Sequence, residues 1–438
     1  MMLRDVFKSL IITKQREIPF AMIEREAALP VNSRSIVSVV GVRRCGKSSR
    51  MQLTINALVE NGVSLEAILW VGFDDERLAG MTSSDLDEVL EAYRELYPSQ
   101  ELKDIYMFFD EIQLIDNWEL FVMRVFKSYC KNIFVSGSNA KMLSQEIATT
   151  LRGWAIEEET YPLSFKEYCQ FTDTKTHHLS EQETTQLRLK WDEFCVESAF
   201  PEIVLTESKS LRDKKLQGYF DAMLFRDLVE RHNINNTGVL RYFIKRLMNN
   251  LTKPTSINAI YNDIKSQGFK ISKDDLYLWA DYVCECFMFL RISKYTPSLI
   301  EEQQALRKYY FIDNGLRQAV LLPQNDDNGK LLENAVLLHL YRYRQTFEKI
   351  TYFTGNKECD FVVQHEQQVK ALFQVCWDLS DPETRQREID GIMEACKKTK
   401  CETMFIITHD EEETILQEGK TIHVIPAWKW MLSLSFSD

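Results

Sequence analysis

The sequence predicts an α/β fold with a parallel sheet in its first 165 residues, followed by helices, an α+β unit and a small α/β unit. Short apolar runs at residues 35–40, 67–73 and 105–109 are typical of buried strands, and helical segments separate them. This alternation of strand and helix is typical of βαβ units. After about residue 161 the pattern changes, and a length of 438 residues also suggests several domains.

Composition and charge exclude several classes of protein. No apolar run of about 18 residues occurs and charges interrupt residues 1–20, so we predict neither a membrane span nor a signal peptide and expect a cytoplasmic protein. The formal net charge of −12 argues against a protein that coats nucleic acid by bulk electrostatics. The ten cysteines form no C-x-x-C pair and no zinc-like spacing, so we expect reduced thiols in the core.

Residues 41–48, GVRRCGKS, fit the phosphate-binding pattern G-x-x-x-x-G-K-[ST] between a predicted strand and a predicted helix. The two glycines allow a tight turn whose backbone N–H groups converge on phosphate oxygens. A lysine then supplies positive charge to the outer phosphates, and Ser48 would hold Mg²⁺. The alternative is a chance glycine turn. The predicted ATP-contacting residues are Gly41, Val42, Arg43, Arg44, Cys45, Gly46, Lys47, Ser48 and Ser49.

A second motif strengthens this interpretation. The apolar strand at residues 105–109 ends directly in Asp110 and Glu111. Asp110 would complete the Mg²⁺ shell with Ser48, and Glu111 would orient and polarise the attacking water. A further strand, NIFVS, leads to Ser138 and Asn139, where a polar side chain would contact the γ-phosphate or the water. The alternative role for Asn139 is the cap of a helix at residues 141–147.

Residues 166–237 are helical and charged, which suggests a lid or linker. Residues 238–315 predict two helices, the second beginning at Ser272, and then two strands, an order typical of a winged helix. The second helix carries one lysine against four acids, so we favour an interdomain or protein-binding role over DNA binding. Lys294 and Lys308 lie near the predicted wing and could contact DNA phosphates, so DNA remains a possible partner.

Residues 316–438 predict a helix carrying Glu333, a strand carrying Asp360 and a strand carrying Gln374. Metal-dependent PD-(D/E)XK nucleases place Mg²⁺ with acids on such elements. Here Gln374, Val375 and Cys376 replace the second acid and the catalytic lysine, so the site is degenerate unless Lys397 or Lys398 substitutes. We favour the alternative that these acids have only a structural role, as caps and ion-pair partners at the ends of strands.

Taken together, the chain resembles the prokaryotic ATP-binding proteins that pair an AAA-type P-loop ATPase domain of the ASCE class with a C-terminal domain of unknown function related to restriction endonucleases. The resemblance implies an ATPase core at residues 1–165 with an N-terminal helical preamble, a winged helix at 238–315 and a nuclease-like domain at 316–438. The segments that carry it are GVRRCGKSS, FFDEIQLIDNW, VSGSNAKML, YPLSFKEY, YFIDNGL, LLENAVLLHL and ECDFVV.

Two departures bear on activity. The family usually has Gly-Arg before the YPLSF segment, whereas this chain has Gly153 and Trp154. If that arginine stabilises transition-state charge, turnover is slow unless Arg152 or a neighbouring subunit of a homo-oligomer replaces it. Cys45 within the loop would have a lowered pKa because of the helix N-terminus, and would be alkylated more slowly with ATP bound.

Three functional hypotheses follow. The first is Mg²⁺-dependent ATP binding and slow hydrolysis to ADP, coupled to movement of the winged-helix and nuclease-like domains on nucleic acid or a protein partner. The second is a metal-dependent nuclease gated by ATP. The third is a scaffold or signalling protein that binds ATP without hydrolysing it. None of the three involves a membrane.

Overall fold

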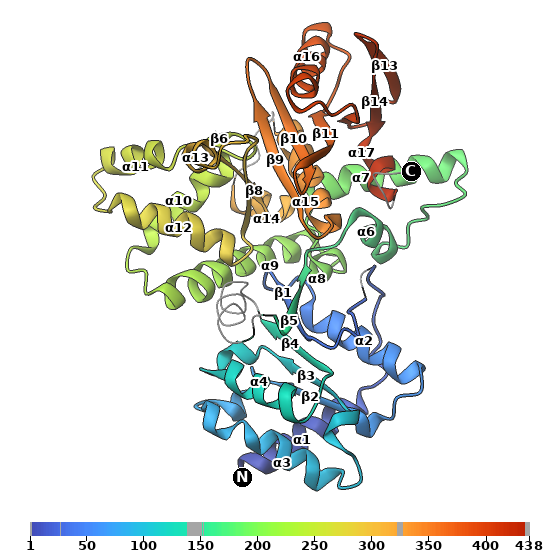
Figure 1. Cartoon of the computed structure of the whole chain (residues 1–438), viewed down its shortest axis with the longest axis vertical. Helices are drawn as coiled ribbons and strands as arrows, with labels where there is room; N and C mark the ends of the chain where they lie inside the picture. Colours follow the sequence, from blue (N-terminus) through green and yellow to red (C-terminus); the bar gives the residue numbers. More distant parts are fainter. Residues whose placement is uncertain (1, 27, 138–150, 152, 322–326, 434–438) are drawn as a thin grey trace. The chain divides into compact units, whose positions relative to one another are not determined.

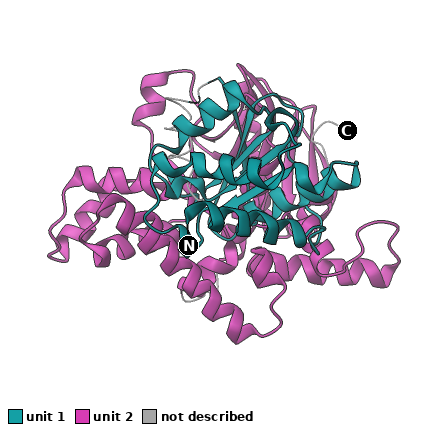
Figure 2. Ribbon diagram, turned by 90° about the horizontal axis from the view of Figure 1, so that it is seen from below, with its two compact units in different colours: residues 1–161, 285–287 teal, residues 162–284, 288–438 magenta. Residues whose placement is uncertain are grey.

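The computed structural model describes all residues except 1, 27, 138–150, 152, 322–326 and 434–438. The chain forms two compact units (Figure 1). Unit 1 comprises residues 1–161 and 285–287, and unit 2 comprises residues 162–284 and 288–438 (Figure 2). No helix within the described ranges is both long and apolar enough to cross a membrane.

Unit 1 contains a five-stranded parallel sheet in the order β2-β3-β4-β1-β5. The strands β1 to β4 are short and almost fully buried, as expected for a parallel sheet covered on both faces, whereas the edge strand β5 is mostly half-buried. Because all strands run the same way, their carboxyl ends meet at one edge, where ligands bind in such sheets. The strands are β1 (Ile36–Gly41), β2 (Ile68–Gly72), β3 (Tyr106–Asp110), β4 (Ile133–Gly137) and β5 (Ala155–Thr160).

The helices of unit 1 flank this sheet (Figure 1). The predicted preamble begins with α1, which packs on α3 and β2, and Arg4 on α1 pairs with Glu88 on α3 at 2.7 Å. Thr82 and Asp85 form a capping box at the 3₁₀ turn of residues 83–85, which precedes α3. The helices are α1 (Leu3–Arg16), α2 (Lys47–Glu60), α3 (Asp87–Leu96) and α4 (Trp118–Ser128), with short 3₁₀ turns at 65–67, 76–78, 83–85, 102–104 and 112–114.

Unit 2 begins with helices and continues into a nine-stranded mixed sheet of order β13-β14-β12-β11-β10-β9-β7-β8-β6. Its helices are α6 (Phe165–Phe171), α7 (Glu181–Val196), α8 (Pro201–Val204), α9 (Lys209–Ala222), a π-helical turn at Met223–Glu230, α10 (Thr237–Asn249), α11 (Ile257–Ser266), α12 (Lys273–Glu285), α13 (Leu299–Gln304), α14 (Asn314–Val320), α15 (Asn328–Tyr343), α16 (Pro382–Thr399) and α17 (Ala427–Leu432). Its strands are β6 (Pro254–Thr255), β7 (Phe289–Lys294), β8 (Arg307–Phe311), β9 (Glu348–Thr354), β10 (Glu358–His365), β11 (Gln368–Cys376), β12 (Met404–Thr408), β13 (Glu413–Gln417) and β14 (Lys420–Pro426).

The strands of the third and fourth predicted segments belong to one sheet. β7 and β8 pair antiparallel, and β6 adds to the far edge of β8. β7 also pairs in parallel with β9, with Ser293 opposite Thr351. The sheet is therefore continuous across the predicted boundary between residues 315 and 316, and β8 lies in the same layer as the strands that carry the predicted acidic site.

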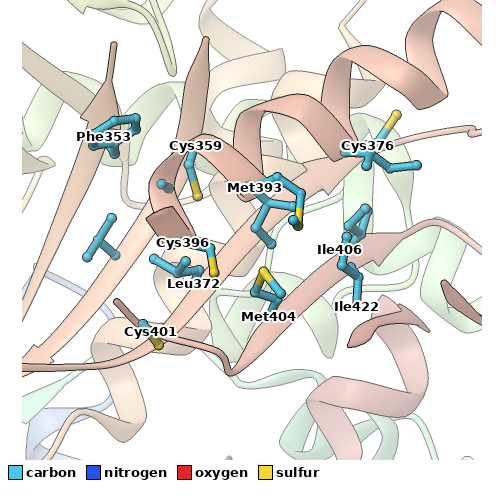
Figure 3. Close-up of a cluster of buried hydrophobic side chains, with 14 of the residues drawn as sticks. Phe353, Cys359, Leu372, Cys376, Met393, Cys396, Cys401, Met404, Ile406 and Ile422 are labelled. Atoms are coloured by element: carbon cyan, nitrogen blue, oxygen red, sulfur yellow. The ribbon is translucent and has the colours of Figure 1, made fainter. Parts of the chain in front are cut away.

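A cluster of buried side chains lies between α16 and the sheet of unit 2 (Figure 3). It is rich in sulfur, because Cys359, Cys376, Cys396 and Cys401 pack there with Met393 and Met404. All ten cysteines are free thiols and only Cys284 is partly exposed. The prediction that the cysteines lie in the core is therefore confirmed for nine of the ten.

The YFIDNGL segment forms a structural joint within unit 2. The Asp313 carboxylate is buried and accepts hydrogen bonds from the backbone N–H groups of Leu316 at 2.6 Å and Ala199 at 2.7 Å. The first bond caps α14 and the second ties that helix to the loop before α8. A Cβ atom on Gly315 would lie 2.1 Å from the Ser198 nitrogen, so no larger residue fits there. This motif therefore fixes the packing of α14.

We predict that Asp313→Ala lowers the free energy of unfolding of unit 2 by ~2–4 kcal/mol, because it removes a helix cap and leaves a second buried N–H group without an acceptor. Urea unfolding followed by circular dichroism measures this. The matched control is Asp381→Ala. Asp381 caps α16 in an exposed position, and its hydrogen-bond donors, Thr384 and Glu383, belong to the first turn of α16 itself, so we expect a loss of about 1 kcal/mol. Equal losses of unfolding free energy in the two variants would contradict the proposal that Asp313 joins α14 to the loop before α8.

Candidate functional site

The glycine-rich loop follows β1 and leads into α2. Gly41 has φ of 147°, and a Cβ atom there would lie 2.1 Å from the Thr160 carbonyl oxygen on β5. Gly46 has φ of 100° in the left-handed region and directly precedes the first residue of α2. The loop thus turns sharply and ends at a helix N-terminus, whose free backbone N–H groups favour anions.

Lys47 is the first residue of α2 and its side chain lies inside the loop. It is 5% exposed, and its ammonium group donates to the carbonyl oxygens of Gly41 at 3.1 Å and Val42 at 3.2 Å. Positive charge is therefore held within the curve of the loop, next to the N–H groups of the helix. Both features attract the oxygens of a phosphate group.

The Asp110 carboxylate at the end of β3 joins three elements. It accepts hydrogen bonds from the hydroxyl groups of Ser136 on β4 and Ser48 on α2. Burial raises the pKa of Asp110, these two hydrogen bonds oppose the rise, and the negative charges of Glu111 and Asp74 add to it. The structure thus brings together Ser48 and Asp110, the two predicted Mg²⁺ ligands, at the carboxyl edge of the sheet.

Glu111 follows Asp110 in a left-handed backbone conformation, with φ of 51°. Its N–H group donates to the Ser136 hydroxyl oxygen at 3.0 Å, so one serine contacts both members of the acidic pair. The Glu111 carboxylate accepts a hydrogen bond from the Gln113 amide at 2.5 Å. The Gln113 carbonyl oxygen is buried and has no hydrogen-bond partner among the described residues. The glutamate is therefore oriented by its own loop and by β4.

Sequence reasoning missed Ser136, Gln113 and Asp74. Ser136 is the polar residue within the apolar segment NIFVS, which was a usable signal, but we looked for the polar contact two or three residues later. Asp74 follows the strand at residues 67–73 just as Asp110 follows the strand at 105–109, and it lies near enough to Asp110 to raise the pKa of that carboxyl.

Two buried or half-buried arginines attach the loop to β5. Arg50 on α2 donates to the Thr160 hydroxyl at 2.9 Å and to the Glu159 carbonyl at 3.0 Å. Arg25 donates to the carbonyl oxygens of Cys45 and Tyr161, both at 3.0 Å. The loop is thus fixed from behind by charge-assisted hydrogen bonds, and neither arginine was predicted to have this role.

The predicted reactivity of Cys45 is wrong. The thiol is fully buried, and burial raises its pKa, although the positive charges of Lys47, Arg25 and Arg50 oppose the rise. The sequence-based prediction took into account the helix N-terminus, which lowers the thiol pKa, but not the loss of water around the sulfur, which raises it. Burial is the larger effect at this position, so Cys45 is a packing residue beneath the loop.

The remaining predicted residues of the loop differ in exposure. Val42 is buried, Arg43 and Ser49 are half-buried and Arg44 is exposed. The predictions for Asn139 and Arg152 lie outside the described residues.

Trp154 lies at the edge of the sheet opposite the loop. Its carbonyl oxygen accepts a hydrogen bond from the Ile36 N–H at 2.8 Å, and Ile36 begins β1, whereas the loop follows Gly41 at the other end. Five residue steps along a parallel strand span about 17 Å. A side chain at position 154 therefore does not reach a phosphate in the loop of its own chain, so Trp154 gives no reason for slow turnover within one chain.

In unit 2, Glu333 on α15, Asp360 on β10 and Gln374 on β11 line one pocket of about 640 Å³. The structure therefore brings together the three residues of the predicted nuclease-like site. Lys397 and Lys398 do not line it and are exposed, and Lys397 pairs with Glu418 at 2.7 Å. Their predicted role as replacement lysines is wrong, because neither side chain lines the pocket that holds the acids.

Lys308 on β8 lies among the acids instead. Its side chain is 1% exposed, and its ammonium group is 3.5 Å from Glu333, 3.6 Å from Asp360 and in contact with Glu358. Burial by itself would lower the pKa of Lys308, but attraction to these three carboxylates raises it. Sequence reasoning placed Lys308 near a wing. The usable signal was a lysine directly before the apolar run YYF of a predicted strand.

Comparisons with known proteins agree with the geometry of unit 1. A family model described as an AAA domain matches residues 33–169, and a domain of unknown function matches residues 188–327. An AAA domain and a five-stranded parallel sheet with a glycine-rich loop after β1 identify the fold of the amino-terminal part as an α/β P-loop NTPase fold.

Several relatives match nearly the whole chain. The uncharacterized protein MJ1544 of Methanocaldococcus jannaschii is 31% identical over 98% of this chain and 94% of its own length. An uncharacterized protein of Haemophilus influenzae is 27% identical over 94% of this chain and 99% of its own length.

Two solved structures also match. The Walker-type ATPase PABY2304 of Pyrococcus abyssi is 13% identical, with a TM-score of 0.42 over 73% of this chain and 96% of its own. The Orc1 protein of Aeropyrum pernix, solved in complex with DNA, is 11% identical, with a TM-score of 0.29 over 73% of this chain and 92% of its own. Likenesses this low carry no argument about activity.

We predict that iodoacetamide labels Cys45 more slowly than Cys284 in the folded protein at pH 7.5, and that ATP does not change the labelling of Cys45. The reason is that Cys45 is fully buried with a raised pKa, whereas Cys284 is partly exposed. Mass spectrometry of peptides after timed labelling measures both residues in one sample. Faster labelling of Cys45, or its slowing by ATP, would restore the original prediction.

Proposed function

The chain belongs to the family that includes the uncharacterized protein MJ1544 of Methanocaldococcus jannaschii, and from its AAA domain and P-loop geometry we propose that it binds ATP with Mg²⁺ and hydrolyses it to ADP and phosphate. The observation that carries this proposal is the contact of Ser48 with Asp110 at the carboxyl edge of the sheet, beside the loop that contains Lys47. This arrangement combines anion-attracting and cation-attracting groups in one place.

The residues present fit a magnesium ion bound together with a nucleotide. Ser48 and Asp110 offer a hydroxyl and a carboxylate oxygen, the ligand type that Mg²⁺ prefers, and Mg²⁺ usually takes only one or two protein ligands beside substrate phosphates. When bound, the ion would neutralise charge on the phosphates. Ser48 and Asp110 would hold it, and the Ser136 hydroxyl would keep the Asp110 carboxylate in place.

The other residues bind phosphate and orient water. Lys47 would exchange its two carbonyl partners for the outer phosphates, assisted by the N–H groups at the start of α2. Glu111 is half-buried beside Asp110, and its carboxylate would accept a proton from the attacking water or orient that water. Gln113 would hold the Glu111 carboxylate in position until the water takes over that contact. Asn139 and Arg152 remain proposed contacts of the γ-phosphate.

We expect Glu111→Gln to lower the ATP hydrolysis rate by about 10²–10⁴-fold while ATP binding persists, because the amide cannot accept the proton of water. Lys47→Ala should abolish both binding and hydrolysis. Malachite green detection of phosphate and a fluorescent ATP analogue measure the two properties separately. Lys103→Ala removes an exposed lysine of unit 1 and is the control. Equal phosphate release by wild type and Glu111→Gln would refute hydrolysis at this site and leave the scaffold hypothesis.

We further expect Ser136→Ala to slow hydrolysis by about tenfold to a hundredfold, because it removes a hydrogen bond to the Asp110 carboxylate and one from the Glu111 N–H. The matched control is Ser38→Ala. Ser38 is equally buried, in the neighbouring strand β1, but its hydroxyl has no hydrogen-bond partner among the described residues. Its loss should change the rate by less than about twofold. Similar rates in the two variants would show that Ser136 does not position the acidic pair.

For unit 2 we propose a winged helix and a nuclease-like domain that move in response to nucleotide state on nucleic acid or a protein partner. The element order α10-β6-α11-α12-β7-β8, with the strand order β7-β8-β6, supports the first assignment. The order α15-β9-β10-β11-α16-β12, with acids on α15 and β10, supports the second. ATP turnover measured with and without duplex DNA distinguishes the two classes of partner. The position of Lys308 bears directly on whether the second domain cleaves nucleic acid.

A further inference from the structure

Three carboxylates converge in the acidic pocket of unit 2, defined here as the pocket lined by Glu333, Glu358, Asp360 and Gln374. Glu333 comes from α15, and the other two acids come from β10. The side chains of Glu333 and Asp360 are only 13% and 10% exposed, so water screens their charges poorly. Neighbouring carboxylates that have lost water need a cation close by to remain charged.

That cation is present in the chain itself. The Lys308 ammonium has all three carboxylates within ion-pair distance, and its side chain is 1% exposed. An ammonium group has three N–H donors, so its donors match its carboxylate partners in number. A divalent ion would need oxygens of these same carboxylates at about 2.0–2.6 Å, and one oxygen of each is already paired with the ammonium group.

The neighbouring groups hold Lys308 in this position. Lys308 lies in the middle strand of the β7-β8-β6 group, opposite Ile292 on one side and Pro254 on the other. Its ammonium group is 5.3 Å from the centre of the Tyr352 ring, a cation–π contact. The next residue but one, Tyr310, donates a hydrogen bond to Glu333 at 2.7 Å. The lysine is therefore held by backbone pairing, by the Tyr352 ring and by carboxylates that are themselves hydrogen-bonded.

The other groups around the acidic pocket offer a divalent ion few oxygens. The carbonyl oxygen of Gln374 is buried without a hydrogen-bond partner among the described residues, but the neighbouring groups are already engaged. One oxygen of Asp360 accepts from the Val375 N–H at 2.9 Å, and its other oxygen faces Lys308. Gln374, at the position of the missing acid, donates its amide to Glu388 at 2.5 Å. Glu388 also pairs with Arg387 at 2.7 Å, so this fourth acid is compensated separately. Within the described ranges, no group of three or more acidic, histidine or cysteine side chains is arranged to hold a metal ion.

We propose that the Lys308 ammonium group replaces the divalent cation in the acidic pocket, so that this pocket binds neither Mg²⁺ nor Mn²⁺ while Lys308 is present. The pocket then keeps the acids of a metal-dependent nuclease but uses them as counter-ions for a lysine from a neighbouring strand. A corollary is that removing the positive charge lets Glu333, Glu358 and Asp360 rearrange around a divalent ion. This inference concerns unit 2 alone and does not depend on ATP hydrolysis.

The test is Mn²⁺ binding to the full chain without nucleotide, measured by electron paramagnetic resonance of the free ion. Wild type and Asp360→Asn should bind the same number of ions, since the pocket holds none. Lys308→Met should bind one more ion than wild type, and Lys308→Met with Asp360→Asn should lose it again. Lys349→Met is the matched control, because it removes a lysine paired with Glu302 outside the acidic pocket and should add no ion.

Two results would overturn the proposal. The first is that wild type binds one more ion than Asp360→Asn, or than Glu333→Gln, which would show that lysine and metal occupy the pocket together. The second is that folded Lys308→Met binds no additional ion. If Lys308→Met unfolds without metal, the comparison of wild type with Asp360→Asn and Glu333→Gln decides alone, and equal binding by the three supports the proposal.

Discussion

The hydrogen bonds that Asp110 accepts from Ser48 and Ser136 join the parts of unit 1 on which the candidate site depends. A carboxylate that is 8% exposed needs donors, because an unpaired charge at that depth costs several kcal/mol. One donor comes from α2, which follows the loop, and the other from β4. Ser136 can donate to Asp110 because its strand, β4, lies between β1 and β3 in the sheet. The strand order therefore decides which serine reaches the aspartate, and Ser136 in turn fixes the backbone of Glu111.

The parts of this site that sequence predicts are those whose chemistry lies in consecutive residues. The loop at 41–48 and the pair Asp110 and Glu111 are such segments, and the structure brings them together. Ser136 and Arg50 escaped prediction because their contacts depend on which strands are neighbours, and a single sequence does not state that order. The predicted reactivity of Cys45 was wrong for another reason. The helix N-terminus lowers a thiol pKa and burial raises it, and the degree of burial of the sulfur depends on the packing of β1, α2 and β5, which no local pattern reveals.

In unit 2 the local elements were predictable and their lateral pairing was not. Ser256 and Ser272 mark the starts of α11 and α12 as cap residues should, because each accepts a hydrogen bond from the first turn. The parallel pairing of β7 with β9 joins segments almost 60 residues apart, Ser293 with Thr351, and no local pattern reveals it. That pairing puts β8 in the same sheet as β10. Without that pairing, sequence order favours a lysine on α16 as the replacement, whereas the lysine beside the acids is Lys308.

The two acidic sites of the chain differ in what compensates the carboxylates. Asp110 is held by two hydroxyl groups, which are neutral, so its negative charge remains available to an ion that arrives with a nucleotide. Glu333, Glu358 and Asp360 are held by an ammonium group, so part of their charge is already neutralised within the fold. At short distances and low dielectric, a fixed positive charge repels an incoming divalent ion by several kcal/mol or more. The kind of donor beside each carboxylate, rather than the number of acids, therefore sets whether the site accepts a metal ion.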